Sequence, residues 1–161
     1  VERGHQRLAF ISAPEGLMFC ELRWAGLEAA LERHGLSLRP EHRIVGDLTQ
    51  RGGFSAMNQL LDASPTPTAV IACNDQMALG AISAAQRRGL LVGRDVAITG
   101  YDDIPLAEQS HPSLTTLRQP IYDIGTQICD MLVCLMQGEV LGERHVLLQP
   151  ELVVRESSGA G

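Results

Sequence analysis

Ala69-Val70-Ile71-Ala72-Cys73 is the stretch that decides the fold of this 161-residue chain, because its five apolar residues follow one another without the alternation of a half-exposed strand. A strand of this kind is buried on both faces, which is typical of a parallel sheet covered by helices. The next segment, Asp75–Arg88, has apolar residues at helical spacing and is followed directly by Gly89. Together they predict one strand-helix unit of an α/β fold.

The same unit recurs along the chain. On the N-terminal side, Leu8–Ile11 predicts a strand and Phe19–His34 a helix, and then Arg43–Gly46 predicts a strand and Gly53–Leu61 a helix. On the C-terminal side, Val96–Thr99 predicts a fourth strand. This succession indicates an α/β fold with a doubly wound parallel sheet.

The pattern changes in the last third of the chain. Leu114–Leu117 is a short β-like piece, and Pro120 suits the first turn of a helix over Ile121–Gln137. Residues 145–154 predict two short strands that are broken at Pro150. The predicted helix carries an apolar stripe formed by Ile121, Ile124, Ile128, Met131, Leu132 and Leu135.

Composition and charge exclude several classes of protein. The chain is 45% apolar and 20% charged, which favours a folded globular domain over a disordered one. Its net charge is −6 and it has no cluster of basic residues longer than a pair, so we expect no direct contact with DNA or RNA. No apolar run approaches the roughly 18–20 residues that span a bilayer, which argues against an integral membrane protein.

Metal and cofactor motifs are absent from the sequence. There is no CxxC pair, no Cys/His cluster at zinc spacing, and no GxGxxG, GxxxxGK[ST] or HExxH motif. We therefore predict no metal site, no cofactor and no enzymatic activity. We expect the four cysteines to be free thiols, buried as small hydrophobes in a reducing compartment: Cys20, Cys73, Cys129 and Cys134.

Polar side chains follow each predicted strand. Arg23 comes early in the helix after the first strand, Asp47 follows the second, Asn74 the third, and Asp102 and Asp103 the fourth. Ligands of open parallel sheets bind beyond the carboxyl ends of the strands. Because carboxylates, amides and a guanidinium group together match adjacent hydroxyl groups, this set favours a polyhydroxylated ligand.

Each of these residues also has a purely structural interpretation. Asn74 or Asp75 could cap the following helix, Asp102 or Asp103 could stabilise a turn, and Arg23 could be a solvated helix residue. An enzyme that uses the two neighbouring carboxylates is the third alternative. It is weaker because adjacent residues of an extended segment point in opposite directions.

Three blocks of sequence carry a family resemblance. They are Cys-Asn-Asp-Gln-Met-Ala-Leu-Gly at 73–80, Gly-Tyr-Asp-Asp at 100–103 and Pro-Ser-Leu-Thr-Thr-Leu-Arg-Gln-Pro at 112–120, supported by residues 4–11 and 23–26. In order and spacing they resemble the effector-binding core of the lac-repressor/gal-repressor (LacI/GalR) family.

The resemblance implies a fold and a division of the chain. The fold would be the C-terminal lobe of a type I periplasmic-binding-protein-like core, present as a fragment. Residues 1–118 would form that lobe, 119–143 would be a crossover helix belonging to the N-terminal lobe, and 144–161 would return as strands and tail. A DNA-binding headpiece and the first part of the N-terminal lobe would lie outside the chain. We expect the exposed apolar stripe either to drive self-association or to fold back on the body.

The resemblance also implies site residues. Arg23, Asn74 and Asp102 stand where the family contacts its effector, and Gln119 matches a cleft residue at a crossover between lobes. Leu48 departs from the family, since many relatives have an aromatic residue there that packs on the sugar ring, and Phe19 could supply the apolar wall instead. With the residue after the second strand added, the candidate ligand-binding residues are Arg23, Asn74, Asp102, Gln119, Phe19 and Asp47.

These expectations define a function. The chain would be the effector-binding part of a cytoplasmic, dimeric bacterial transcription regulator, whose ligand is a sugar or a related small polyol or nucleoside. That ligand would modulate operator DNA binding by a helix-turn-helix outside this chain. The alternative is a secreted or periplasmic sugar-binding protein of similar fold.

Overall fold

The computed structural model describes residues 4–142 and 144–159, and its centre is a four-stranded sheet. The strand order is β2-β1-β3-β4 and every pairing is parallel. This order confirms the doubly wound α/β fold predicted from the sequence. The strands are β1 (Leu8–Ser12), β2 (Arg43–Val45), β3 (Ala69–Ala72) and β4 (Ala97–Thr99).

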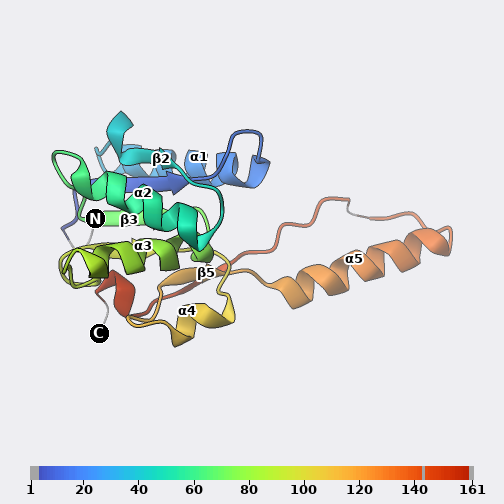
Figure 1. The fold of residues 1–161 in the computed structure, drawn as a ribbon. Coiled ribbons are helices and arrows are strands. Elements are labelled where there is room, and N and C mark those ends of the chain that lie inside the picture. The colour runs from blue at the N-terminus through green and yellow to red at the C-terminus, as the bar shows by residue number, and fades with distance from the viewer. Residues whose placement is uncertain (1–3, 143, 160–161) are drawn as a thin grey trace.

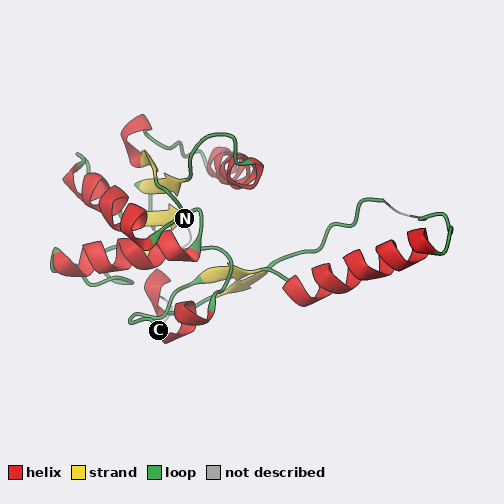
Figure 2. Ribbon diagram, turned by 45° about the vertical axis from the view of Figure 1, so that its right-hand side comes forward, coloured by secondary structure: helices red, strands yellow, loops and turns green. Residues whose placement is uncertain are grey.

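Three helices cover the two faces of this sheet. α2 (Gln50–Asp62) and α3 (Asp75–Arg87) lie on one side, and α1 (Met18–Arg33) lies on the other (Figures 1 and 2). α2 begins three residues before its predicted start, because the Thr49 side chain caps it by accepting a hydrogen bond from Gly52 N at 3.0 Å. The core between these layers contains Phe10, Ile11, Met57, Leu60, Val70, Met77 and Ile98.

α2 and α3 pack so closely that glycine is required where they touch. A Cβ atom on Gly53 would overlap the backbone of Met77, and one on Gly80 would overlap the backbone carbonyl of Gln50. Backbone atoms on rigid helices cannot move aside cheaply. The two glycines that weaken the helical pattern in sequence are therefore the residues that allow the helices to meet.

Gly53→Ala is expected to lower the free energy of unfolding by about 3 kcal/mol, because the added methyl group overpacks this contact. The matched control is Gly26→Ala in α1, where an added Cβ would meet no atom within 4 Å. That change should raise stability by about 0.5–1 kcal/mol through helix propensity. Urea denaturation of both variants measures the difference; equal effects would contradict the packing argument.

A second, two-stranded sheet extends from the edge of the first. β5 (Thr116–Arg118) pairs antiparallel with β6 (Glu151–Val153), and parallel bridges join Thr115 to Thr99 and Arg118 to Asp102. The sequence predicted two strands in residues 145–154, but only β6 is present, because residues 145–150 have no neighbouring strand to pair with. The short helix α4 (Pro105–Gln109) and the 3-10 turns η1 (Pro40–His42) and η2 (Glu156–Ser158) were not predicted, since each is too short to show a period.

The remaining helix, α5 (Ile121–Met136), leaves the body of the molecule and projects away from it (Figure 1). None of its residues is buried. The structure therefore shows no folding back of this helix, which was one of the two expectations for its apolar stripe. Among the described residues, no helix is long and apolar enough to cross a membrane.

Candidate functional site

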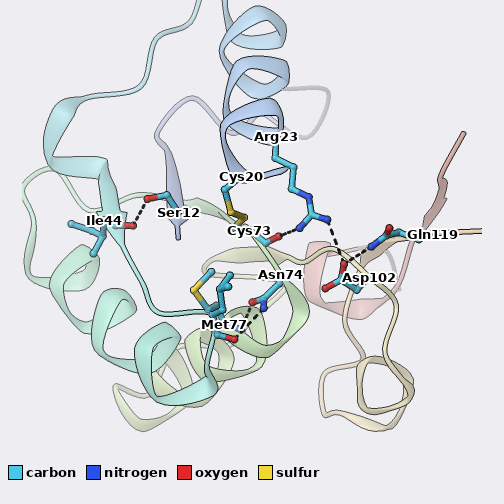
Figure 3. Close-up of a disulfide and its surroundings, with 10 residues drawn as sticks. Ser12, Cys20, Arg23, Ile44, Cys73, Asn74, Met77, Asp102 and Gln119 are labelled. Carbon is cyan, nitrogen blue, oxygen red and sulfur yellow. Dashed lines mark hydrogen bonds and ion pairs between the residues drawn. A yellow bond between two sulfur atoms is a disulfide. The ribbon is translucent and has the colours of Figure 1, made fainter. Parts of the chain in front are cut away.

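Arg23 is the centre of a polar cluster at the carboxyl ends of β3 and β4. It extends from α1 and donates to the carbonyl oxygen of Cys73, and its second terminal nitrogen lies 3.5 Å from Asp102 Oδ1 (Figure 3). The guanidinium group stacks on Tyr101, 3.6 Å from the ring centroid, and also lies over Phe19. Its side chain is only 18% exposed. The Arg23 side chain is therefore fixed by its contacts with Cys73, Asp102 and Tyr101 and is not a solvated helix residue.

Asp102 faces Arg23 and a second donor. Gln119 Nε2 donates to Asp102 Oδ1 at 2.7 Å, and the Asp102 backbone N–H bonds to Leu117 O. The side chain remains 31% exposed, so it can still accept from a ligand. Its φ of +121° is rare for a residue with a side chain. The turn after β4 thus directs this carboxylate toward the cleft.

Asp103, the neighbouring carboxylate, faces away from the cleft. It accepts from Arg155 at 2.7 Å and from Arg118 at 2.6 Å, and its side chain is 8% exposed. Burial alone would raise its pKa, but the hydrogen bonds from Arg155 and Arg118 outweigh burial, and the pKa of Asp103 is lowered. The two adjacent carboxylates serve different partners, which argues against a paired acid–base mechanism.

Asn74 caps a helix and also lines the candidate site. Its Oδ1 accepts from Met77 N at 3.0 Å and caps α3, while its Nδ2 donates to Leu48 O at 3.1 Å. The capping interpretation is correct for Asn74, and the side chain nevertheless lines the cleft. The bond to Leu48 O holds that residue at a φ of +67°.

Asp75, the next residue, is fully buried beneath this cluster. It accepts from Thr116 Oγ1 at 2.6 Å and from Ile104 N at 2.9 Å, and burial raises the pKa of its carboxyl group. Its own N–H donates to Tyr101 O. Asp75 therefore fixes the floor of the site and does not reach the ligand side.

A hollow of about 330 Å³ collects most of the predicted site residues. It is lined by Phe19, Arg23, Leu48, Asn74, Asp102 and Gln119. Asp47, the sixth candidate, is not among them: its carboxylate accepts from the backbone and hydroxyl of Thr49, and it lines a separate hollow beside α2. The hydrogen bonds to Thr49 account for the lowered pKa of Asp47. Asp47 thus stabilises the turn that enters α2.

Two contributors were not among the candidates. Tyr101 lies beneath Arg23, and Leu48 lines the hollow. Tyr101 had a signal in the sequence, since it directly precedes Asp102 after the fourth strand. The hydrogen bond that orients Leu48 comes from Asn74, 26 residues away in the chain, so no pattern of neighbouring residues could have predicted it.

The prediction of four buried free thiols is wrong in two respects: the two buried cysteines are not free, and of the two free ones Cys129 is exposed and Cys134 is half-buried. Cys20 and Cys73 form a disulfide, with their Cα atoms 6.3 Å apart, whereas Cys129 and Cys134 are free. The pair is separated by 53 residues, so only the packing of α1 against β3 brings it to bridging distance. The bridge lies beside Arg23 at the start of α1 (Figure 3).

The chemistry of this site is that of binding. It offers a cationic fork, a carboxylate, two amide side chains and an apolar wall, a combination that pairs with vicinal hydroxyl groups. In the described part of the chain, no group of three or more His, Cys, Asp or Glu side chains could hold a metal ion.

Comparison with known proteins agrees with the geometry. The family model of the periplasmic binding protein-like domain matches residues 1–158. The transcriptional repressor CytR of Escherichia coli K12 is 42% identical over 99% of this chain, and the ribose operon repressor of the same strain is 37% identical over 98%. The chain spans 47% and 48% of the length of these two relatives.

Solved structures give the same result. A LacI-family regulatory protein from Chloroflexus aggregans superposes with a TM-score of 0.93 at 37% identity, covering 97% of this chain and 56% of that one. The chain therefore belongs to the periplasmic binding protein-like domain family, and its homologues are transcriptional repressors and LacI-family regulators.

Proposed function

We propose that this chain is the effector-binding part of a cytoplasmic bacterial transcription regulator, and that its ligand is a sugar or a related small polyol or nucleoside. The observation that carries the proposal is the convergence of Arg23, Asp102, Gln119 and Asn74 on one hollow of about 330 Å³. The similarity to the ribose operon repressor supports a ligand with ribose-like hydroxyl groups.

The ligand would bind by replacing weak contacts within the cluster. Arg23 and Asp102 are 3.5 Å apart, so a hydroxyl group placed between them can accept from the guanidinium group and donate to the carboxylate. Gln119 leads from β5 into α5, so a ligand that engages it also touches the segment that leaves the body. A second lobe would close on the ligand by way of this segment, and that closure would bias the regulator between two states.

The partners follow from the same proposal. The net charge of −6 is unsuited to DNA, so operator binding would belong to a helix-turn-helix outside these 161 residues. The regulator would act as a homodimer. The division at residues 118 and 143 stays a prediction, supported by the departure of α5 from the body.

The alternative, a secreted sugar-binding protein, is not favoured, because the relatives named above are repressors and regulators. The same relatives argue against an enzyme, as does the orientation of Asp103 toward Arg155 and Arg118.

The test is ligand-induced stabilisation. D-ribose, D-glucose, adenosine and cytidine are added to the protein as its gene encodes it, and unfolding is followed by calorimetry. A compound at 100 times its Kd is expected to raise the unfolding midpoint by about 8 °C. If none of the four shifts the midpoint or gives a saturable heat of binding, the proposed ligand class is wrong.

A further inference from the structure

The Cys20–Cys73 pair joins two elements that carry the candidate site. Cys20 lies in the first turn of α1, one turn before Arg23, and Cys73 follows β3 directly before Asn74. The carbonyl oxygen of Cys73 is itself an acceptor for Arg23. A change at these two sulfur atoms therefore acts on both the helix that presents Arg23 and the strand end that receives it.

α1 has few other attachments to the sheet. Only two of its 16 residues, Cys20 and Leu31, are buried. No side chain caps its first turn, because the N-cap residue is Leu17. Trp24 adds one ring contact to Phe10, with centroids 5.6 Å apart. The covalent link is thus one of a small number of attachments of α1, together with Trp24 and Leu27, which pack against the core, and the Arg43 guanidinium group over the Trp24 ring.

An apolar cavity adjoins the Cys73 end of the bridge, while both cysteines are themselves buried, Cys20 at 5% and Cys73 at 1% exposed. Cys73 lines this cavity of about 650 Å³ on the α1 side of the sheet, together with Arg23 and Tyr101. Cys129 and Cys134 lie on α5, away from this cavity, and take no part.

We propose that Cys20 and Cys73 form a redox modification site, a reversible disulfide that sets how firmly α1 holds Arg23 at the cleft. Reduction breaks the sulfur–sulfur bond: the protein disulfide and two molecules of glutathione give two cysteine thiols and one molecule of oxidised glutathione. Oxidised glutathione reverses the step. In the dithiol form α1 loosens, Arg23 leaves Cys73 O and Asp102, and effector binding weakens. The weakening of effector binding rests on the proposed function, whereas the reversible bridge and the loosening of α1 do not.

The test uses the chain with Cys129→Ser and Cys134→Ser, so that only the pair remains. After incubation in glutathione mixtures of different ratio, alkylation and mass spectrometry count the free thiols. Hydrogen exchange of the α1 amides and the fluorescence of Trp24, the single tryptophan, report the position of the helix. We expect reversible bridging, at least tenfold faster exchange in α1 after reduction, and an unfolding midpoint about 10 °C lower.

Cys20→Ser serves as the permanently open control: it should match the reduced chain in hydrogen exchange, Trp24 fluorescence and unfolding midpoint, and it has one free thiol where the reduced chain has two. The proposal is overturned if oxidised glutathione fails to form the bridge, or if the oxidised and reduced chains show the same exchange in α1. A ligand titration of both forms with D-ribose, D-glucose, adenosine and cytidine separates the two hypotheses. If α1 loosens on reduction and none of the four binds either form, the switch stands and the proposed ligand class fails.

Discussion

Replacing Asp102 with Ala is expected to weaken effector binding about 100-fold, while the free energy of unfolding changes by less than about 1 kcal/mol. The loss follows from a ligand hydroxyl group losing a charged acceptor, and from Arg23 and Gln119 losing the carboxylate that orients them toward the ligand, about 3 kcal/mol together. Stability changes little because Asp102 is 31% exposed and its ion pair with Arg23 is long. Calorimetric titration and urea denaturation measure the two quantities.

Asp47→Ala is the matched comparison. The order of strands along the sequence placed this residue at the same rim as Asp102, but its carboxylate is occupied by Thr49 in a separate hollow. We expect wild-type affinity from Asp47→Ala. If Asp102→Ala also binds with wild-type affinity, Asp102 does not contact the ligand. If both variants lose affinity equally, the ligand site extends beyond the hollow lined by Phe19 and Gln119 and includes Asp47.

Asp103→Ala should have the opposite profile, a large loss of stability. Arg155 is 13% exposed and is held by Asp103 Oδ1 and by Leu114 O. Removing the carboxylate leaves a nearly buried guanidinium group without its counter-ion, which costs about 3 kcal/mol. Since Arg155 lies between β6 and η2, the C-terminal segment should detach first. Hydrogen exchange at residues 151–158 and urea denaturation at pH 7 test this.

The pH dependence of that loss has a defined sign. The pKa of Asp103 is lower in the folded chain than its ordinary value of 3.8, so its stabilising contribution is complete above that value. It disappears as the pH falls through the lower, folded pKa. The difference between wild type and Asp103→Ala should therefore be constant near neutrality and shrink below pH 3.8.

Asp62→Ala is the control for an ion pair of similar length. Asp62 bonds to Arg88 at 2.9 Å, but both side chains are largely exposed, at 65% and 46%. Its loss should cost less than about 1 kcal/mol. If Asp103→Ala costs no more than this, burial does not strengthen the pairing with Arg155.

The sequence alone was sufficient for the sheet and its helices. Ala69–Cys73 is a continuous apolar run, and the helix after it has apolar residues at helical spacing, so the repeated unit predicts a parallel sheet covered by helices. The strand order β2-β1-β3-β4 came from the structure. Arg23, Asn74 and Asp102 were predicted to converge because the carboxyl ends of parallel strands share an edge, and they line one hollow. Phe19 and Gln119, which line the same hollow, were named from the family resemblance. Hydrophobic period and strand direction are local properties, so residues near each other in the chain are enough to reveal them.

Only the tertiary structure decided the remaining features. The bridge between Cys20 and Cys73 spans 53 residues, and Asp103 meets Arg155 across 52. Asp47 turned to Thr49, while Asp102 turned to the cleft through a backbone angle that its type rarely adopts. Each outcome depends on the direction of a single side chain after distant elements have packed. Packing is set by the shapes of many residues at once, so no local stretch of the sequence contains it.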